Sequence, residues 1–318
     1  LWGQAYGGIS NCNRVIYQLD NLDFEVTGKE SVIAELEVAR AYWYYILCEA
    51  FGNVPIVDRF DVPEGFLPET SSREEVFAFI ENSIKNNVDK LSDDTKTYYG
   101  RFNKWNAKML LARLYLNAES WIGKNMYTEC MALCTEIMNS NKYALENDYS
   151  APFYAQNEGS QEIIFAYPAD EVKTGSTIYM ALQKTLHPSN VKTFNLQTWL
   201  DNGVCAVPTF IDTYEEGDKR LPKTWRMGQQ YGSDGSILYC TGLVPGWEGK
   251  PLIYTKEVSN LENGGEAEGY RCGKYEIKMG TSRALDNDWV AMRYAEVYLM
   301  KAECILLSLI HISEPTRQ

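Results

Sequence analysis

Residues Glu35–Val57 read ELEVARAYWYYILCEAFGNVPIV, a stretch that begins as an amphipathic helix and ends at a fixed break. Apolar side chains recur in and just before it at the three- and four-residue spacing that gives a helix one buried face. They are Ile33, Leu36, Ala39, Trp43, Ile46, Leu47 and Ala50. Gly52 can adopt the left-handed conformation that closes a helix, and Pro55 prevents the helix from resuming. The stretch predicts a long helix that stops just before Gly52.

The rest of the first half predicts more helices of the same kind. Ser72 and Glu75 form a capping-box pattern at the start of one helix, Asn103 can cap the next, and Gly123 can end it. Each helix carries one apolar stripe, so each has to bury that face against a neighbour. We therefore expect helix pairs in a tetratricopeptide-like arrangement without the strict repeat signature. The helical aromatic residues assigned to the core are Trp43, Tyr44, Trp105 and Trp121.

The pattern changes between Ala144 and Asp286. Gly, Pro, Asn and Asp become frequent and helical spacing fades, apart from short runs at Ser176–Thr185 and Val207–Tyr214. Long irregular segments inside a compact chain are generally functional. We predict a single, mostly α-helical domain with a few short strands, in which an irregular, loop-rich layer is mounted on the helices. Its parts are a helical-pair scaffold at 1–143, the loop-rich binding layer at 144–286, a returning scaffold helix at 287–307, and a tail at 308–318.

Several segments resemble one known family, in the family's order. Besides the opening stretch they are RFNKWNAKMLLARLYLNAESW (Arg101–Trp121), SQEIIFAYPAD (Ser160–Asp170), NGVCAVPTFIDTYEEGDKRLPKTW (Asn202–Trp225), EGYRCGKYEIKMG (Glu268–Gly280) and NDWVAMRYAEVYLMKAEC (Asn287–Cys304). Together they are similar to the signatures of the SusD/RagB family, which are surface nutrient-binding lipoproteins of the Bacteroidota outer membrane.

The resemblance implies a SusD-like fold and a noncatalytic protein, exposed at the cell surface and held to the outer membrane by a lipid anchor. It implies an oligosaccharide or polysaccharide ligand and no cofactor. It also implies a partner, a TonB-dependent transporter of the SusC type that receives the ligand. Contact residues vary within the family, so the resemblance transfers no site residue to this chain.

Both ends of the chain depart from the family pattern. No signal peptide or acylated cysteine precedes Leu1, and LSLIHISEPTRQ (Leu307–Gln318) resembles a translated sequencing adaptor. We expect the chain to be a fragment lacking both family termini, with residues 308–318 non-native and poorly ordered. We also expect the last helix to leave an apolar face uncovered.

Composition excludes two classes of partner. The chain has 43 acidic and 30 basic residues, a formal net charge of −13, and no basic stripe of the kind that binds nucleic acid. The same charge disfavours docking to anionic lipid, and no run of eighteen apolar residues predicts a transmembrane helix. A neutral ligand fits such an acidic surface.

The cysteines predict no metal centre. Cys48, Cys130, Cys134 and Cys304 occupy apolar helical positions, where cysteine behaves as a small buried hydrophobe. The alternative, that Cys130 and Cys134 are metal ligands four residues apart, needs two further ligands. Three more cysteines lie in the loop-rich region and can pair in an oxidising compartment: Cys205, Cys240 and Cys272.

Catalytic groups are scarce. The two histidines are His187 and His311, so a histidine-dependent triad or metal site would rest on His187 alone. Carboxylate pairs leave a glycoside hydrolase as the alternative, since that chemistry needs two carboxylates roughly 5–10 Å apart. The candidate pairs are Asp212 with Glu215 or Glu216, Asp170 with Glu171, and Glu266 with Glu268.

Aromatic residues are the positive signal for function. The chain has 22 Tyr, 8 Trp and 11 Phe, many of them in the loop-rich region beside amide and basic side chains. Flat rings cover the apolar faces of sugars, while Arg, Asn and Gln bond the hydroxyls. Any single one of these rings can instead pack the loops onto the helices, and a protein-binding adaptor role for the helical pairs also stays open. The candidate ligand-binding residues are Tyr179, Gln183, Trp199, Asn202, Trp225, Arg226, Tyr231 and Trp247.

Overall fold

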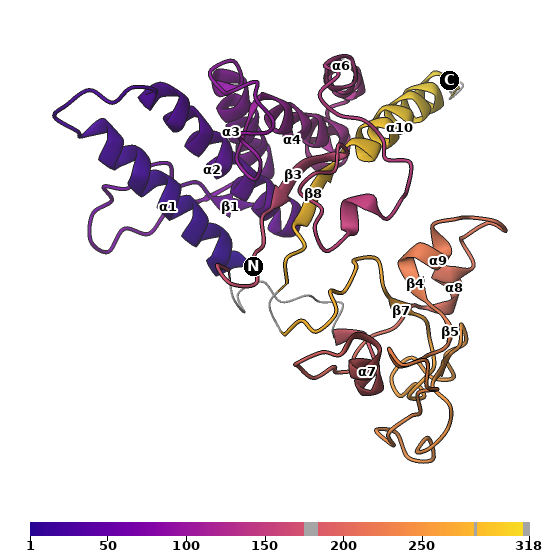
Figure 1. The fold of residues 1–318 in the computed structure, drawn as a ribbon. Helices are drawn as coiled ribbons and strands as arrows, with labels where there is room; N and C mark the ends of the chain where they lie inside the picture. Colours follow the sequence, from indigo (N-terminus) through magenta and orange to yellow (C-terminus); the bar gives the residue numbers. More distant parts are fainter. Residues whose placement is uncertain (175–183, 283–284, 314–318) are drawn as a thin grey trace. The chain divides into compact units, whose positions relative to one another are not determined.

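A computed structural model describes residues 1–174, 184–282 and 285–313 (Figure 1). The candidate residues Tyr179 and Gln183 lie outside the described residues, as does most of the helical run predicted at 176–185. The chain divides into two compact units. Unit 1 comprises residues 1–145, 161–166 and 291 onward, and unit 2 comprises residues 146–160 and 167–290. The predicted organisation, a single domain with a scaffold and a loop-rich layer, stays a prediction.

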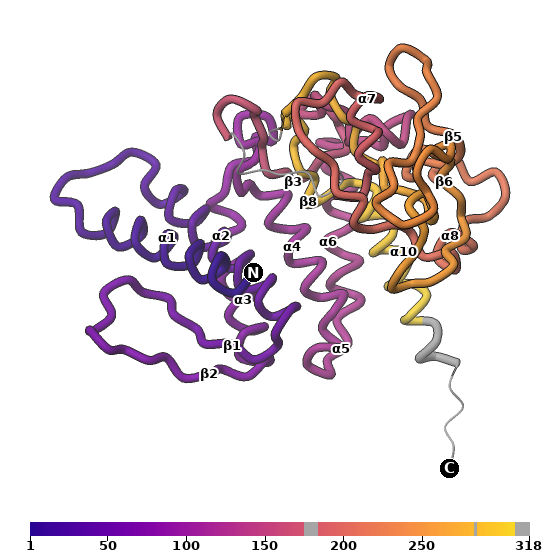
Figure 2. The backbone as a smooth tube through the Cα atoms, turned by 90° about the horizontal axis from the view of Figure 1, so that it is seen from below, coloured from indigo at the N-terminus to yellow at the C-terminus, as the bar shows by residue number. Residues whose placement is uncertain are grey.

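Unit 1 consists of packed helices, as predicted. Its helices are α1 (Trp2–Asp20), α2 (Lys29–Phe51), α3 (Arg73–Asn87), α4 (Lys104–Leu116), α5 (Ala118–Ile122), α6 (Tyr127–Asn139) and α10 (Tyr294–Ser313). Helix α1 packs on α2, and α2 packs on α3. Helix α6 packs on α4 on one side and on α10 on another (Figure 2). This mostly helical, tetratricopeptide-like architecture confirms the predicted fold class.

Helix α2 confirms the predicted end but corrects the predicted face. It ends at Phe51, and Gly52 follows with φ 75°, a conformation that favours glycine. Of the predicted stripe, however, Leu47 is buried and the other members are half-buried or exposed. The residues that α2 buries instead are Ala34, Val38, Arg40, Ala41, Tyr42, Tyr44, Tyr45, Leu47 and Cys48. Because α1, α3 and α4 all contact this helix, it buries more than one stripe.

The predicted helix signals are present at three other ends. Ser72 accepts a hydrogen bond from the Glu75 amide and Glu75 bonds back to Ser72, a complete capping box. The Asn103 side chain likewise accepts from the amide of Asn106, at the start of α4. Gly123 adopts the left-handed conformation at φ 68°, but it closes the short helix α5 and not the helix that Asn103 begins, because α4 already ends at Leu116. These caps satisfy backbone groups that the helix itself leaves unpaired.

A pair of adjacent glycines in α1 gives the first testable prediction. A Cβ added to Gly8 would overlap the indole of Trp43 on α2, whereas one added to Gly7 meets nothing within 4 Å. We expect Gly8→Ala to lower the free energy of unfolding by about 1–3 kcal/mol through overpacking. Gly7→Ala is the matched control and should raise it by roughly 0.5–1 kcal/mol, because alanine loses less backbone entropy in a helix. Urea denaturation measures both, and equal effects of the two changes would contradict the α1–α2 packing.

The segment before α10 corrects a second prediction. Residues 287–307 were expected to be one helix, but Trp289–Arg293 form strand β8, and the helix begins at Tyr294 and continues to Ser313. Strand β8 pairs with β3 (Ile163–Tyr167), a partner that local spacing does not reveal. Helix α10 therefore extends into the predicted tail, of which residues 314–318 lie outside the described residues.

Predicted core residues are buried to different degrees. Tyr44 is fully buried, whereas Trp43, Trp105 and Trp121 are half-buried. Trp105 uses this position to donate its indole N–H to Asp93 at 2.7 Å. The four cysteines predicted as small core residues, Cys48, Cys130, Cys134 and Cys304, are buried. All eight cysteines are free thiols, so the pairing allowed for Cys205, Cys240 and Cys272 is wrong in this structure.

Unit 2 is built mainly from loops, with short elements between them. They are η1 (Ala151–Phe153), η4 (Pro188–Asn190), α7 (Val191–Phe194), α8 (Pro208–Ile211), α9 (Leu221–Thr224), β4 (Trp225–Arg226), β5 (Gly228–Gln229), β6 (Ile253–Tyr254) and β7 (Arg271–Cys272). One apolar cluster surrounds Phe153, Leu186 and Tyr275, and a second surrounds Leu252 and Tyr254. These clusters hold the loops of unit 2 in place. In unit 1, β1 (Val54–Pro55) pairs with β2 (Thr70–Ser71) to form a two-stranded ladder.

Candidate ligand-binding site

A pocket of about 550 Å³ in unit 2 brings three of the candidate residues together: Trp225, Arg226 and Tyr231. We call it the aromatic pocket. Its other lining residues are Thr193, Pro222, Lys223, Met227, Gln229, Gln230, Gly232 and Gly273. Its volume is in the range of pockets that hold small ligands, and rings beside amides and cations suit a hydroxyl-rich ligand.

Two short ladders position the pocket residues. Strand β4 pairs antiparallel with β7, which sets Trp225 opposite Cys272 and Arg226 opposite Arg271. Strand β5 pairs instead with β6, setting Gln229 opposite Ile253. Met227 alone separates the two strands, and Gly228, the first residue of β5, has φ 68°, a conformation that favours glycine. Residues 225–227 and 229–231 therefore line one pocket although the two strands belong to different ladders.

Trp225 offers a ring face to the pocket. Its indole N–H already donates to the hydroxyl of Tyr214 at 3.2 Å, and its ring makes an edge contact with Phe210 at 6.2 Å between centroids. These contacts fix the indole, which stays half-buried. Because its polar atom is committed, what remains for a ligand is apolar surface, which suits stacking on a sugar ring.

Tyr231 and the amides supply the polar groups. Tyr231 is 50% exposed, and its hydroxyl has no hydrogen-bond partner among the described residues. Gln229 donates its side-chain N–H groups to backbone carbonyls, including that of Leu252 at 3.2 Å, and Gln230 donates to the carbonyl of Gly228 at 2.9 Å. These bonds orient the amides and hold the pocket wall. The Tyr231 hydroxyl can donate to or accept from a ligand hydroxyl.

Arg226 lies across the pocket wall. Its guanidinium carbon is 4.5 Å from the centre of the Phe194 ring, a cation–π contact. A Cβ on Gly273 would lie 2.9 Å from the Cγ of Arg226, so a glycine there leaves room for the arginine stem. Burial lowers the pKa of Arg226, because the charged form loses hydration.

The remaining candidates lie elsewhere. Asn202 lines a second pocket of about 580 Å³, but its amide donates to the Glu266 carbonyl at 3.0 Å and accepts from Arg271 at 3.0 Å. The Trp247 indole lies against Gly265, where a Cβ would overlap it, and is 4.7 Å from the Lys250 ammonium. Trp199 is 57% exposed but is not among the residues lining the aromatic pocket.

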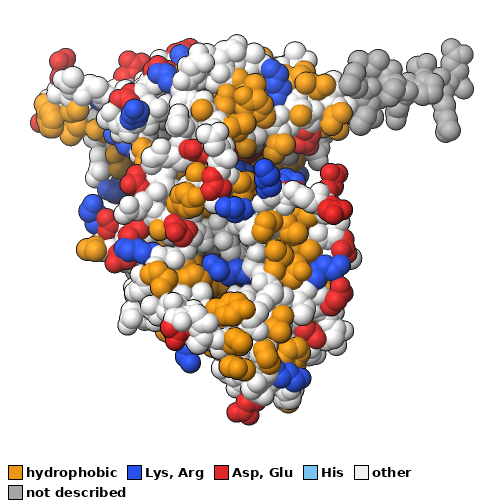
Figure 3. All heavy atoms as spheres, turned by 45° about the vertical axis from the view of Figure 1, so that its right-hand side comes forward, with side chains coloured by type: hydrophobic (Ala, Val, Ile, Leu, Met, Phe, Trp, Pro, Cys, Tyr) orange, Lys and Arg blue, Asp and Glu red, His pale blue; other side chains and the backbone are white. Residues whose placement is uncertain are grey.

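Exposed rings occur outside the aromatic pocket as well. Tyr239 is 50% exposed, and Trp289 is 41% exposed while stacking on Tyr275 at 5.2 Å and 6°. Figure 3 shows hydrophobic side chains in patches between charged ones on the face that it presents. Single exposed rings are ordinary, so the grouping of rings with polar atoms in one concavity distinguishes the aromatic pocket.

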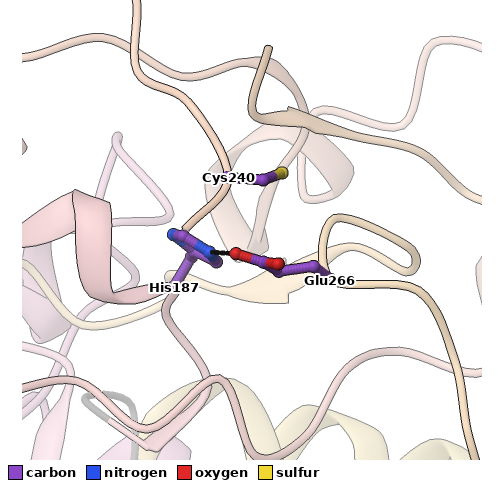
Figure 4. A group of neighbouring side chains, drawn as sticks. All are labelled: His187, Cys240 and Glu266. Carbon is purple, nitrogen blue, oxygen red and sulfur yellow. Dashed lines mark hydrogen bonds and ion pairs between the residues drawn. The ribbon is translucent and has the colours of Figure 1, made fainter. Parts of the chain in front are cut away.

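A buried cluster of His187, Cys240 and Glu266 was not expected from the sequence (Figure 4). Their potential ligand atoms lie within 4.8 Å of one another. His187 Nδ1 accepts from the Ser189 amide at 3.0 Å, so its other nitrogen carries the proton and donates to Glu266 at 2.5 Å. Burial lowers the pKa of His187, which favours this neutral form.

The cluster fits neither a metal nor a nucleophile. Glu266 already accepts from the amides of Thr241 and Gly242, at 2.5 and 3.0 Å, as well as from His187. Both histidine nitrogens and both carboxylate oxygens are therefore committed, and a cation would have to displace these bonds. Burial raises the pKa of Cys240 to about 11, so its thiol is not activated. We interpret the cluster as a structural clip that ties three distant loops together.

The carboxylate pairs proposed for a hydrolase have other partners. Asp212 pairs with Lys256 at 2.7 Å, and Glu171 pairs with Lys278 at 3.2 Å. Glu268 accepts from the amides of Ser259 and Gly265, at 3.0 and 2.7 Å. None of the described residues that line the aromatic pocket is an Asp or Glu. The pocket therefore lacks, among those residues, the acid and base that glycoside hydrolysis uses.

Comparison with known proteins gives consistent results. The sequence family described as "Starch-binding associating with outer membrane" matches residues 1–116, and the SusD family matches residues 134–308. The chain is 26% identical over 309 residues to the starch-binding protein SusD of Bacteroides thetaiotaomicron, covering 86% of this chain and 54% of that protein. A SusD-like protein of Bacteroides ovatus is 25% identical over 174 residues, covering 52% of this chain and 32% of the relative.

Solved structures share the fold. A SusD superfamily protein from Parabacteroides distasonis superposes with a TM-score of 0.73 at 22% identity, covering 96% of this chain and 62% of that one. Surface glycan-binding protein A from Bacteroides fluxus gives a TM-score of 0.71 at 20% identity, covering 96% and 61%. The chain thus spans about half the length of the curated SusD and about three fifths of these structures. Within the described part of the chain, no helix has the length and apolar character that a membrane span requires.

Proposed function

The chain belongs to the SusD family, and from this membership we propose that it binds oligosaccharides or polysaccharides without cleaving them. We propose further that it acts at the surface of the outer membrane, held by a lipid anchor, and hands its ligand to a TonB-dependent transporter of the SusC type. The first relatives matched include a starch-binding protein, and a structural neighbour is a surface glycan-binding protein.

The aromatic pocket is the observation that supports this proposal. Trp225 presents an apolar ring surface whose polar atom is already bonded, and Tyr231, also a lining residue, has a hydroxyl with no hydrogen-bond partner among the described residues. A sugar needs both kinds of group, since its ring faces are apolar and its edges carry hydroxyls. The ordered amides of Gln229 and Gln230 keep the wall rigid, which reduces the entropy lost on binding.

A shallow site of this kind favours release as well as capture. Stacking and a few hydrogen bonds correspond to a Kd of about 1 mM to 1 µM, or roughly −4 to −8 kcal/mol. Affinity in this range lets a bound glycan leave the pocket for a transporter.

Titration against a glycan panel tests the proposal. Isothermal titration calorimetry with starch, hemicellulose, host and algal oligosaccharides is expected to show binding to at least one of them. Reducing-end assays on the same mixtures are expected to show no increase over a protein-free control. If no glycan of the panel binds, glycan binding is contradicted and the protein-binding adaptor role remains. If reducing ends are released, the protein is a glycoside hydrolase.

A further inference from the structure

The charge of the aromatic pocket differs from the charge of the chain. The described residues that line it include two cations, Lys223 and Arg226, and no carboxylate. The whole chain carries a formal net charge of −13. A cationic pocket in an acidic protein concentrates anions locally, because nearby charges act over about 10 Å at ordinary ionic strength.

Arg226 is the cation without a counter-ion. Lys223 has a carboxylate 3.6 Å away, that of Asp148. Arg226, in contrast, forms no ion pair with any described residue, and its Nε atom is buried without a hydrogen-bond partner. Its guanidinium lies over the ring of Phe194. A guanidinium in a pocket wall without an ion pair leaves N–H donors for the acceptor oxygens of a ligand.

The residue paired with Arg226 across the β4–β7 ladder does not neutralise it. That residue, Arg271, is 2% exposed, and its guanidinium donates to the carbonyls of Glu268 and Gly269, at 2.6 and 2.8 Å. Arg271 lines the second pocket and not the aromatic pocket, so Arg226 is the guanidinium that a ligand in the aromatic pocket would meet. Burial lowers the pKa of Arg226, because the charged form loses hydration.

We propose that the aromatic pocket selects an anionic glycan, whose carboxylate or sulfate group binds the guanidinium of Arg226 while Trp225 and Tyr231 contact its sugar rings. This inference rests on the proposed glycan-binding function and narrows its ligand class. Guanidinium groups bind carboxylate and sulfate oxygens through two parallel N–H donors, which suits either source of the charge.

Matched glycan pairs test the inference. The first pair is oligogalacturonate and its methyl ester, in which a neutral ester replaces each carboxylate on the same sugar chain. The second is a sulfated galactan oligosaccharide and its desulfated form. Calorimetric titration is expected to show that the anionic member of at least one pair binds about tenfold tighter than its neutral partner, or more. The pair that shows the preference identifies carboxylate or sulfate as the recognised group.

Two variants locate the preference. Arg226→Met removes the charge but keeps an unbranched stem over Phe194, and should abolish the preference between the charged and the neutral member of a pair. Lys250→Met is the matched control, since it also removes a cation held over a ring, that of Trp247, outside the pocket lining, and should keep the preference. Circular dichroism confirms that both variants are folded.

The outcomes separate the two proposals. Equal binding of charged and neutral partners, or a preference that survives Arg226→Met, overturns the anionic selectivity and leaves glycan binding intact. Absence of binding to every member of both pairs and of the wider panel overturns both. If Lys250→Met also loses the preference, the preference depends on the net charge of the protein, and a role specific to Arg226 is overturned.

Discussion

Replacing Glu266 by alanine is expected to lower the free energy of unfolding by about 3–5 kcal/mol. The change would leave the His187 Nε2–H and the amides of Thr241 and Gly242 buried without their acceptor. On folding, each of these groups gives up its hydrogen bonds to water and bonds to Glu266 instead. Without the carboxylate the groups stay buried away from water and have no hydrogen-bond acceptor. Urea denaturation followed by tryptophan fluorescence measures the loss.

Glu268→Ala is the matched control for this prediction. Glu268 lies two residues away and also accepts from two loop amides, but it is half-buried and has no histidine partner. We expect it to cost about 1–2 kcal/mol. A loss in Glu266→Ala no larger than in this control would contradict the structural clip.

Lowering the pH is expected to destabilise the same clip. The pKa of His187 is lowered by burial from 6.5, and the pKa of Glu266 is lowered from 4.5 although burial opposes it, because His187 and loop amides bond to it. In both cases the unfolded chain binds more protons than the folded one, so stability present at neutral pH falls as the pH drops below 6.5. Wild-type unfolding curves from pH 7 to 4 check the direction.

Replacing Trp225 by alanine is expected to weaken glycan binding about 10- to 100-fold, or roughly 1.4–2.8 kcal/mol. Trp225 is the only tryptophan among the described residues that line the aromatic pocket, and its indole contacts Tyr214 and Phe210, which fix it in place. A fixed ring loses little entropy on binding, so its removal costs most of the stacking energy. Calorimetric titration with the best ligand of the panel gives the ratio.

Trp199→Ala is the matched control for that measurement. Trp199 is also a tryptophan of unit 2 and is 57% exposed, but it is not among the residues that line the aromatic pocket. Its replacement should leave the affinity unchanged within about twofold. The reverse pattern, loss in Trp199→Ala and none in Trp225→Ala, would move the site away from the pocket.

Local signals in the sequence predicted local structure well. Gly52, Ser72 with Glu75, and Asn103 act through the backbone of their own helix ends, so short spacing is enough to locate them. The buried face of α2 was not predicted correctly, because burial depends on how many helices surround it. Strand β8 was missed for a related reason, since its partner β3 is distant in sequence.

The candidate site followed the same rule. Trp225, Arg226 and Tyr231 come within seven residues of each other, and two adjacent strands gather them into one pocket. Asn202 and Trp247 were named on the same chemical grounds, but Asn202 bonds with Arg271 and the Glu266 carbonyl, and Trp247 lies against Gly265, all distant partners. The clip joins His187 to Glu266, which are 79 positions apart in the sequence, and no local spacing pattern predicts such a pair. Thr193 and Gly273 also line the pocket, and they were not predicted because both are distant in sequence from residues 225–231.

A crystal structure of the protein with the oligosaccharide that binds best in the panel tests the central claim most directly. The account predicts a sugar ring in van der Waals contact with the indole of Trp225, and a ligand oxygen within hydrogen-bond distance of Tyr231 or Arg226. A ligand bound at another surface, with the aromatic pocket holding only solvent, would contradict it.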